Sequence, residues 1–221
     1  MISKKFLNKV SEKDFLSSAK YLGIAIDTEA IIDIEHYVNI ESFFLAATYR
    51  LNSSRVAEGF LCWLLRYGHL LSPSKIRRLI QSGQHYNRSV LGGFILFIID
   101  HKINFRQWKL LMSYAHKSKE PKPLIEGPRP KNPNIFFMKY NIIVHNYKMD
   151  IDKFLIPIAT VYKNCSELRN RALFGSVVNS DVASFLKWFP DASPYQIAKE
   201  TNNHKARVFQ IYKNIKLAIS I

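Results

Sequence analysis

The sequence of 221 residues is long enough for one large domain or two small ones, and for a substantial buried core. Hydrophobic residues make up 48% of it and charged residues 22%, which excludes a disordered, collagen-like or low-complexity chain. The 32 Lys and Arg residues outnumber the 17 Asp and Glu residues, giving a formal net charge of +15. A surplus of this size predicts attraction to polyanions, either nucleic acid or an acidic membrane or protein surface.

The two cysteines, Cys62 and Cys165, form neither a disulfide framework nor a zinc motif of the Cys-x-x-Cys type. We therefore expect a reduced, cytoplasmic setting. The first ten residues alternate charged and apolar side chains and lack the apolar core of a signal peptide. The longest apolar run, residues 90–99, is about half as long as a bilayer requires, so we expect a buried helix and no membrane partner.

Positive charge is concentrated in the middle of the chain. Residues 101–149 contain ten Lys and Arg against two Glu, whereas the segments before and after have net charges of only +3 and +4. Aromatic residues are interleaved with these cations. Such a stretch suits nucleic acid, because cations meet phosphates and rings offer stacking faces for bases. A solvated surface with core rings is the alternative interpretation.

Helical periodicity dominates the first part of the chain. Ser72 and Pro73 fit the N-cap and first turn of one of the expected helices. Gly92 and Gly93 lie inside another, where we expect them to permit close packing and not to form a phosphate loop. No strand-like alternation of any length occurs, so residues 1–116 are predicted to be an all-α domain for assembly or for contact with a protein partner. The expected helices cover residues 4–20, 28–51, 55–71, a segment opened by 72–74, 86–99 and 104–114.

Residues 117–134 contain five prolines and one glycine. Because proline cannot continue a helix, we expect a basic, extended connector over residues 117–149. Within it, residues 135–138 are expected either to form a short strand or to dock on the neighbouring core. The connector is predicted to make non-specific phosphate contacts through Lys119, Lys122, Arg129 and Lys131.

Helical periodicity resumes near residue 152, and a helix over residues 166–174 is expected to end at Gly175. The strongest local signal follows, in residues 179–215. A helix of about eight residues, a tight turn and a longer helix is the order of a helix-turn-helix. Residues 179–181 (Asn-Ser-Asp) can cap the helix before this pair. Ser193-Pro194 opens the short helix, and the long one is predicted from His204 through Ile215.

Individual residues fit that arrangement. Asn202 falls in the turn, where a left-handed conformation is usually needed, and Asn adopts it best after Gly. One face of the long helix has an apolar stripe at spacing i, i+3, i+4, i+7, formed by Val208, Ile211, Tyr212 and Ile215. The opposite face carries side chains that hydrogen-bond base edges or phosphates. With Tyr195 of the short helix, the predicted nucleic-acid-binding residues are His204, Lys205, Arg207, Gln210, Lys213 and Asn214.

Residues 196–212 (QIAKETNNHKARVFQIY) resemble a prokaryotic helix-turn-helix or winged-helix transcriptional regulator, and residues 168–186 resemble the lead-in to its first helix. The resemblance implies that residues 150–221 form a domain that reads double-stranded DNA, as a homodimer, to regulate transcription. Two features depart from the family. Asn203 stands where the family usually buries an aliphatic residue, which predicts a looser turn. After Ile215 the chain has enough residues for one strand but not for a wing hairpin, so the domain lacks a wing, or the chain was cut, or another subunit completes it.

Motifs for catalysis are missing from the sequence. The seven histidines lack metal-ligand spacing, and we expect no metal, no cofactor and no enzyme activity. Asp150 and Asp152 could hold Mg²⁺, but at a helix start such a pair is more simply a cap. Three alternatives to DNA binding stay open: a protein-interaction module, antitoxin-like or the partner of an effector; an RNA or single-strand binder using residues 101–149; and an enzyme with an unrecognised site.

Overall fold

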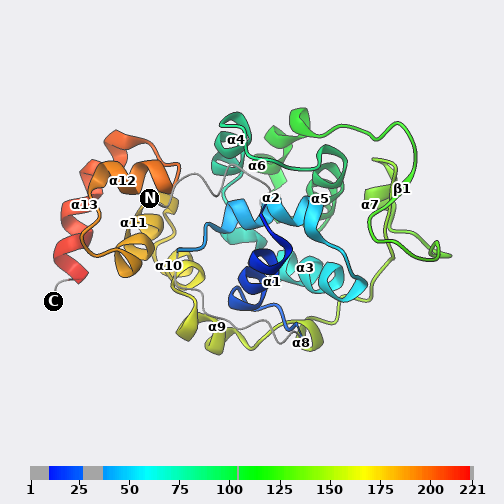
Figure 1. Ribbon diagram of the computed structural model, residues 1–221, viewed down its shortest axis with the longest axis horizontal. Coiled ribbons are helices and arrows are strands. Elements are labelled where there is room, and N and C mark those ends of the chain that lie inside the picture. Colours follow the sequence, from blue (N-terminus) through cyan, green and yellow to red (C-terminus); the bar gives the residue numbers. More distant parts are fainter. Residues whose placement is uncertain (1–9, 27–36, 104, 220–221) are drawn as a thin grey trace.

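Helices form most of the chain in the computed structural model, and they pack on one another without a central sheet (Figure 1). The structure describes residues 10–26, 37–103 and 105–219. Among these, the strands are two residues each, β1 (Lys122–Pro123) and β2 (Ile142–Ile143), which pair in parallel. The predicted all-α class is therefore confirmed. None of the described helices combines the length and the apolar character needed to span a bilayer.

The first half of the chain forms a helical body. It comprises α1 (Glu12–Tyr21), α2 (Ile40–Arg50), α3 (Ser54–Tyr67), η1 (Gly68–Leu70), α4 (Pro73–Gln81), α5 (Arg88–Asp100), α6 (Phe105–Trp108) and η2 (Lys109–Tyr114). Ser72 caps α4 as predicted, because its side chain accepts a hydrogen bond from the backbone N–H of Lys75. The helix predicted over residues 104–114 is a short α-helix followed by a 3-10 helix. The predictions for residues 1–9 and 27–36 lie outside the described residues.

Aromatic rings fill the centre of this body. The Phe44 ring lies 5.4 Å from the Trp108 ring and 5.7 Å from the Phe94 ring, centre to centre. Close packing at the two glycines of α5 is confirmed. A Cβ atom on Gly93 would come within 2.3 Å of the Phe137 ring, and one on Gly92 would meet Tyr140 at 2.4 Å. The glycines thus let a later segment of the chain settle directly on α5.

That later segment contains α7 (Ile135–Met138), a single helical turn where the sequence allowed a strand. The strand alternative is wrong, and docking on the core is correct, since Phe137 is fully buried. Asn134 explains the helical turn: its side chain accepts a hydrogen bond from the backbone N–H of Phe136 and so caps the turn. Residues 117–133 follow the surface at one end of the body (Figure 1), whereas residues 142–144, which include β2, are buried.

The remaining helices complete the chain: α8 (Ile151–Phe154), α9 (Ile158–Asn164), α10 (Ser166–Phe174), α11 (Val177–Trp188), α12 (Pro194–Glu200) and α13 (Lys205–Ile219). Asp150 caps α8 by accepting a hydrogen bond from the backbone N–H of Lys153, so its predicted capping role is confirmed. Gly175 ends α10 in the left-handed conformation, with φ of 59°, also as predicted.

Buried apolar side chains form two clusters. The larger draws on residues from Phe15 to Leu168 and so includes part of the predicted connector and the helices after it. The smaller combines side chains of α11, α12 and α13 with Tyr37. The division between the two clusters therefore falls between α10 and α11. The sequence, in contrast, predicted domain boundaries at residues 117 and 150. The domain ranges themselves stay a prediction.

Candidate nucleic-acid interface

Helices α11, α12 and α13 form a three-helix unit at one end of the molecule (Figure 1). Ser193 caps α12 by accepting a hydrogen bond from the backbone N–H of Gln196, and Pro194 occupies the first turn. Asn202, in the turn between α12 and α13, has φ of 54°, which is the left-handed conformation that the sequence predicted. The local signals in the sequence therefore produce the predicted pair of helices.

The apolar stripe of α13 faces the smaller core. Val208 is fully buried, and Ile211, Tyr212 and Ile215 are half-buried against the same cluster. The Tyr212 hydroxyl donates a hydrogen bond to the carbonyl of Ala192, 3.0 Å away, which fixes the helix against the loop before α12. The predicted stripe is confirmed. The helix continues through residue 219, however, so residues 216–219 do not form the strand that the sequence allowed.

The opposite face of α13 is open to solvent. Each polar residue predicted to contact nucleic acid is exposed: His204, Lys205, Arg207, Gln210, Lys213 and Asn214. The ammonium of Lys205 lies 4.8 Å from the centre of the Tyr195 ring, which brings Tyr195 of α12 to the edge of this face. The structure thus gathers all the residues predicted in α12 and α13 on one accessible surface.

Sequence reasoning missed Phe209, whose side chain is 49% exposed on this surface. The Lys205 ammonium lies 5.8 Å from the centre of its ring. The signal was available in the spacing, since Phe209 follows Lys205 and precedes Lys213 by one helical turn each. The exposed face of α13 therefore includes an apolar ring among its cations.

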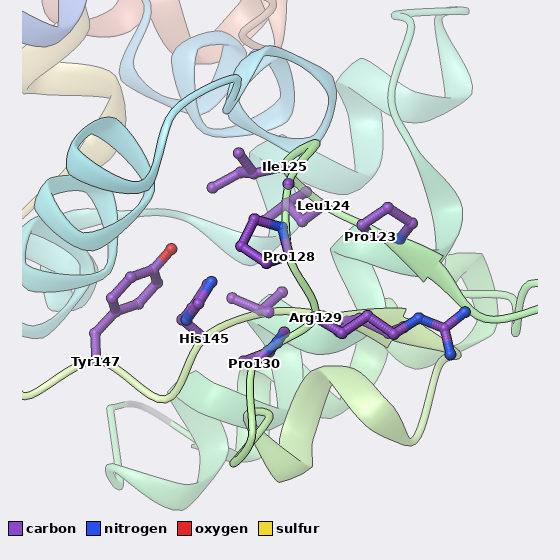
Figure 2. A pocket seen from close by; sticks show the side chains of 11 residues that line it. Pro123, Leu124, Ile125, Pro128, Arg129, Pro130, His145 and Tyr147 are labelled. Atoms are coloured by element: carbon purple, nitrogen blue, oxygen red, sulfur yellow. The ribbon is translucent and has the colours of Figure 1, made fainter.

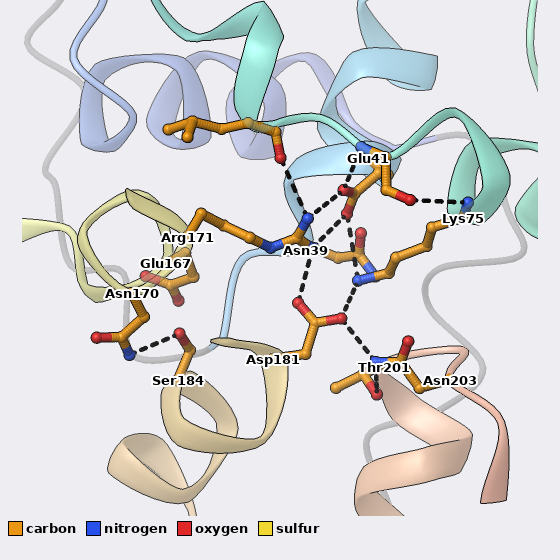
Figure 3. A network of polar contacts seen from close by, with 12 residues as sticks. Asn39, Glu41, Lys75, Glu167, Asn170, Arg171, Asp181, Ser184, Thr201 and Asn203 are labelled. Carbon is orange, nitrogen blue, oxygen red and sulfur yellow. Dashed lines mark hydrogen bonds and ion pairs between the residues drawn. The ribbon is translucent and has the colours of Figure 1, made fainter. Parts of the chain in front are cut away.

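A buried network of charged side chains ties the three-helix unit to the body (Figure 3). Asp181 of α11 lies 2.6 Å from the ammonium of Lys75 on α4 and 2.8 Å from the guanidinium of Arg171 on α10. Both cations also contact Glu41 of α2, at 3.2 Å and 2.8 Å respectively. All four residues are at most 5% exposed. Two cations and two carboxylates thus neutralise each other where four helices meet.

The sequence predicted Asp181 as part of a helix cap, and that prediction is wrong. Helix α11 begins at Val177, so Asp181 lies one turn inside it and its carboxylate faces the buried cations. Burial opposes ionisation of this carboxyl, but Arg171 and Lys75 outweigh the burial and hold its pKa below the ordinary value. The Tyr37 hydroxyl donates to the same carboxylate at 3.1 Å.

Asn203 extends the network into the turn before α13. Its side-chain amide donates to Asp181 at 2.6 Å and to the Thr201 hydroxyl at 3.0 Å. The guanidinium of Arg78 donates to the carbonyl of Asn202 at 3.2 Å and to the side-chain oxygen of Asn203 at 3.3 Å. The prediction of a looser turn is therefore wrong. Hydrogen bonds fix the buried Asn203 side chain, whereas the family uses the packing of an aliphatic side chain at this position.

Glu167 forms a second buried link between the body and α11. Its carboxylate accepts hydrogen bonds from the Tyr21 hydroxyl at 2.7 Å and the backbone N–H of Val38 at 3.1 Å on the body side. On the other side it accepts one from the Trp188 indole at 3.1 Å. Burial and the negative charge of Glu167 raise the pKa of Tyr21 well above its ordinary value, so this hydroxyl stays a donor.

The cations predicted for the connector are exposed but lie elsewhere. Lys119, Lys122, Arg129 and Lys131 belong to the segment around β1, at the end of the molecule opposite α12 and α13 (Figure 1). The structure therefore does not bring the two predicted sets of nucleic-acid contacts together. They form two separate surfaces.

The aromatic residues interleaved with those cations contribute to the core. Trp108 and Phe137 are fully buried. The other rings described in residues 101–149 are partly buried and pack against the larger cluster: Tyr114, Phe136, Tyr140 and Tyr147. Because these rings are wholly or partly taken up by core packing, the single-strand alternative loses much of the feature that suggested it.

Candidates for catalysis are weak in the part of the chain that the structure describes. No group of three or more His, Cys, Asp or Glu side chains there is placed to hold a metal ion. Burial raises the pKa of the Cys62 thiol to about 11 and that of the Cys165 thiol further above its ordinary value. Reactive cysteines have a lowered pKa, and these two have the opposite.

Comparison with known proteins gives no match: no family model, no curated protein and no solved structure matches this chain. The resemblance of residues 196–212 to helix-turn-helix regulators therefore stays a prediction from the sequence.

Proposed function

We propose that the protein binds double-stranded DNA by inserting α13 into the major groove, and that it regulates transcription by doing so. One observation supports this most strongly: α13 turns its apolar side into the core and leaves a face of cationic and amide side chains accessible. Arg and Lys hydrogen-bond the O6 and N7 atoms of guanine, and Gln and Asn pair with adenine. A helix that carries these side chains fits the major groove of a duplex.

The order of residues along α13 divides their proposed roles. Residues in the first turns of a recognition helix contact base edges, so Arg207 and Gln210 are assigned to bases. Lys205 and Lys213 lie on the flank shared with Phe209 and are assigned to phosphates. Tyr195, at the start of α12, is assigned to a phosphate beside the groove, which its hydroxyl would contact.

The buried network supports the same proposal. Because Asn203 and Arg78 hold the turn before α13, the helix is fixed against α11 before any ligand binds. Binding then costs mainly the ordering of exposed side chains, and a preorganised surface of this kind gives more affinity for the same contacts. A single module of this size usually needs a second copy for useful affinity, so a cytoplasmic homodimer is part of the proposal.

Fluorescence anisotropy with a pool of random-sequence duplexes tests the proposal. The variant with Arg207→Ala and Lys213→Ala is expected to bind the duplex at least about tenfold more weakly than the unaltered protein. A matched variant with Lys13→Ala and Lys163→Ala removes two exposed cations from the body, far from α13 in sequence, and is expected to keep its affinity. Equal losses in both variants would show that the α13 face is not the binding surface.

A protein partner is the second candidate for this surface. It is favoured by Tyr195 and Phe209, which are 58% and 49% exposed, because aromatic side chains are enriched at protein interfaces. Phe209→Ala separates the two functions. A DNA-binding surface that depends on charge loses little affinity for duplex with this substitution, whereas an interface centred on the ring loses most of its affinity for the partner.

A further inference from the structure

Residues 117–148, called here the basic ribbon, carry seven Lys and Arg side chains against two Glu. All seven cations are exposed. None of them forms an ion pair with a carboxylate of the described residues, in contrast to Lys75 and Arg171, which are paired and buried. The ribbon therefore presents unneutralised positive charge to the solvent, which attracts a polyanion.

The basic ribbon is held in place on the body. The backbone N–H groups of Lys122 and Leu124 donate to the carbonyls of Asn141 and Ile143, at 2.9 Å and 3.0 Å, and form the β1–β2 pair. Figure 2 shows the prolines of the ribbon packed around a small pocket, with the Arg129 side chain extending away from it. The cations are thus displayed on a fixed surface, so little chain entropy is lost when they bind.

The ribbon and α13 lie at opposite ends of the longest dimension of the molecule, with the helical body between them (Figure 1). A compact chain of 221 residues is about 40 Å across. Helix α13 lies at the outer edge of its end of the molecule, with its apolar stripe facing the core formed with α11 and α12 (Figure 1). A duplex held on the opposite face of α13 therefore lies beyond that end, and a groove about 8.5 Å deep does not span the distance to the ribbon. DNA stays stiff over about 150 base pairs, and bending one short duplex around the body to meet both surfaces is unfavourable.

The composition of the ribbon favours a duplex over a single strand. Its described aromatic rings pack against the core, with Phe137 fully buried and the others partly buried, so little ring surface is left for stacking on bases. Its exposed cations contact a phosphate backbone without reading bases, which is how non-specific duplex binding works.

We infer that the basic ribbon is a second, non-specific duplex-binding surface, and that one chain bridges two DNA segments, one on α13 and one on the ribbon. The inference rests on the proposed function of α13. The buried network between Glu41 and Asp181 fixes the angle between the two ends, so the bridged segments are held in a defined relative orientation.

A bead assay measures the bridging directly. One biotinylated duplex is immobilised, full-length protein is added at low salt, and a fluorescent second duplex is captured from solution. Replacing three ribbon cations with Glu (Lys119→Glu, Lys122→Glu and Lys131→Glu) is expected to reduce capture at least about tenfold, because three phosphate contacts are lost. Affinity for a single duplex, measured by anisotropy, is expected to change less than about threefold, since α13 provides it.

The matched control reverses three exposed cations outside the ribbon and α13, on α1, α8 and α9: Lys13→Glu, Lys153→Glu and Lys163→Glu. It changes the net charge equally and is expected to retain capture. A neutral version of the ribbon variant, with Gln at the same three positions, is expected to lose capture as well, and it guards against misfolding caused by the acidic substitutions.

The outcomes separate this inference from the proposed function. If the unaltered protein binds one duplex through α13 but captures no second duplex, bridging is wrong and the proposed function stands. Capture that survives the ribbon substitutions also overturns the inference, because paired copies of α13 would then do the bridging. Single-stranded RNA or anionic vesicles that occupy the ribbon in place of duplex would overturn it too. If Arg207→Ala with Lys213→Ala changes neither single-duplex affinity nor capture, the proposed function itself fails.

Discussion

Cationic side chains lie on both sides of the three-helix unit, but in opposite environments. Toward the body, Lys75 and Arg171 are buried and share two carboxylates (Figure 3). Toward the solvent, Arg207 and Lys213 are exposed on α13. All four cations contribute equally to the net charge of the chain. The charges of Lys75 and Arg171, however, are neutralised by Asp181 and Glu41. Only the solvent side is available to a polyanion.

The comparison also shows what each side contributes. Burying two ion pairs costs desolvation, so the network is weak evidence for stability and better evidence for position. It joins α2, α4, α10 and α11, and so determines where α13 points. The solvent side contributes little to folding and is free to serve recognition.

The largest expected effect is on the buried side. Asp181→Ala leaves Lys75 and Arg171 with one carboxylate instead of two, and removing one partner of a buried network costs about 3–5 kcal/mol of the free energy of unfolding. Denaturant unfolding followed by circular dichroism measures this. Arg207→Ala on the exposed side is expected to stay within about 0.5 kcal/mol of the unaltered protein. A similar small loss for Asp181→Ala would show that the network does not hold the unit.

Low pH is expected to weaken the buried network and so to lower the free energy of unfolding. The pKa of Asp181 is lower in the folded protein than its ordinary value, so its ionised form stabilises the fold above the ordinary Asp range near 4. This stabilisation is lost as the pH falls below that range and through the folded pKa. Denaturant unfolding at a series of pH values is expected to show a steeper acid loss for the unaltered protein than for Asp181→Asn. If the free energy of unfolding depended on pH equally in the two proteins, ionised Asp181 would not be the source of the stabilisation.

On the exposed side, single substitutions in α13 are expected to show which residues determine the preference for a DNA sequence and which contribute affinity for any duplex. Gln210→Ala is expected to relax the preference for one base pair in selected duplexes, at a cost of about 1–3 kcal/mol for that base. Lys213→Ala is expected to weaken all duplexes by a similar factor, because it contacts phosphate. Sequencing of duplexes selected by each variant checks this, and a variant of Lys213 with altered sequence preference would reverse the assigned roles.

The smallest expected effect lies in the turn that joins the two sides. Asn202 has φ of 54°, so Asn202→Ala is expected to destabilise the protein by about 1 kcal/mol, while Asn202→Gly is tolerated. Thermal unfolding of the two variants measures the difference. Equal melting temperatures would mean that the backbone can leave the left-handed conformation without loss.

Local features could be predicted from the sequence because they depend on neighbours in the chain. The caps at Ser72 and Ser193, the left-handed Asn202 and the close packing at Gly93 all follow from residue type and spacing. The fold class and the exposed face of α13 follow from apolar periodicity in the same way.

The buried network could not be predicted, because its members are far apart in the chain. Asp181 and Lys75 are separated by 106 positions, and nothing near Asp181 in the sequence distinguishes a pairing residue from a cap. The placement of α13 and the basic ribbon at opposite ends of the molecule could not be predicted either, because the positions of cations in the sequence do not show how the chain folds between them. Phe209, by contrast, could have been predicted from the sequence, because it lies one helical turn from both Lys205 and Lys213 on the exposed face.

The salt dependence of duplex affinity tests the central claim most directly. Each phosphate contact contributes a slope of about −0.9 to a plot of log affinity against log salt concentration. Of Arg207 and Lys213, only Lys213 is assigned to phosphate, so replacing both with Ala is expected to make the slope shallower by about 0.9, while replacing Lys13 and Lys163 leaves it unchanged. A slope that is the same in all three proteins would contradict the claim that the exposed face of α13 binds DNA.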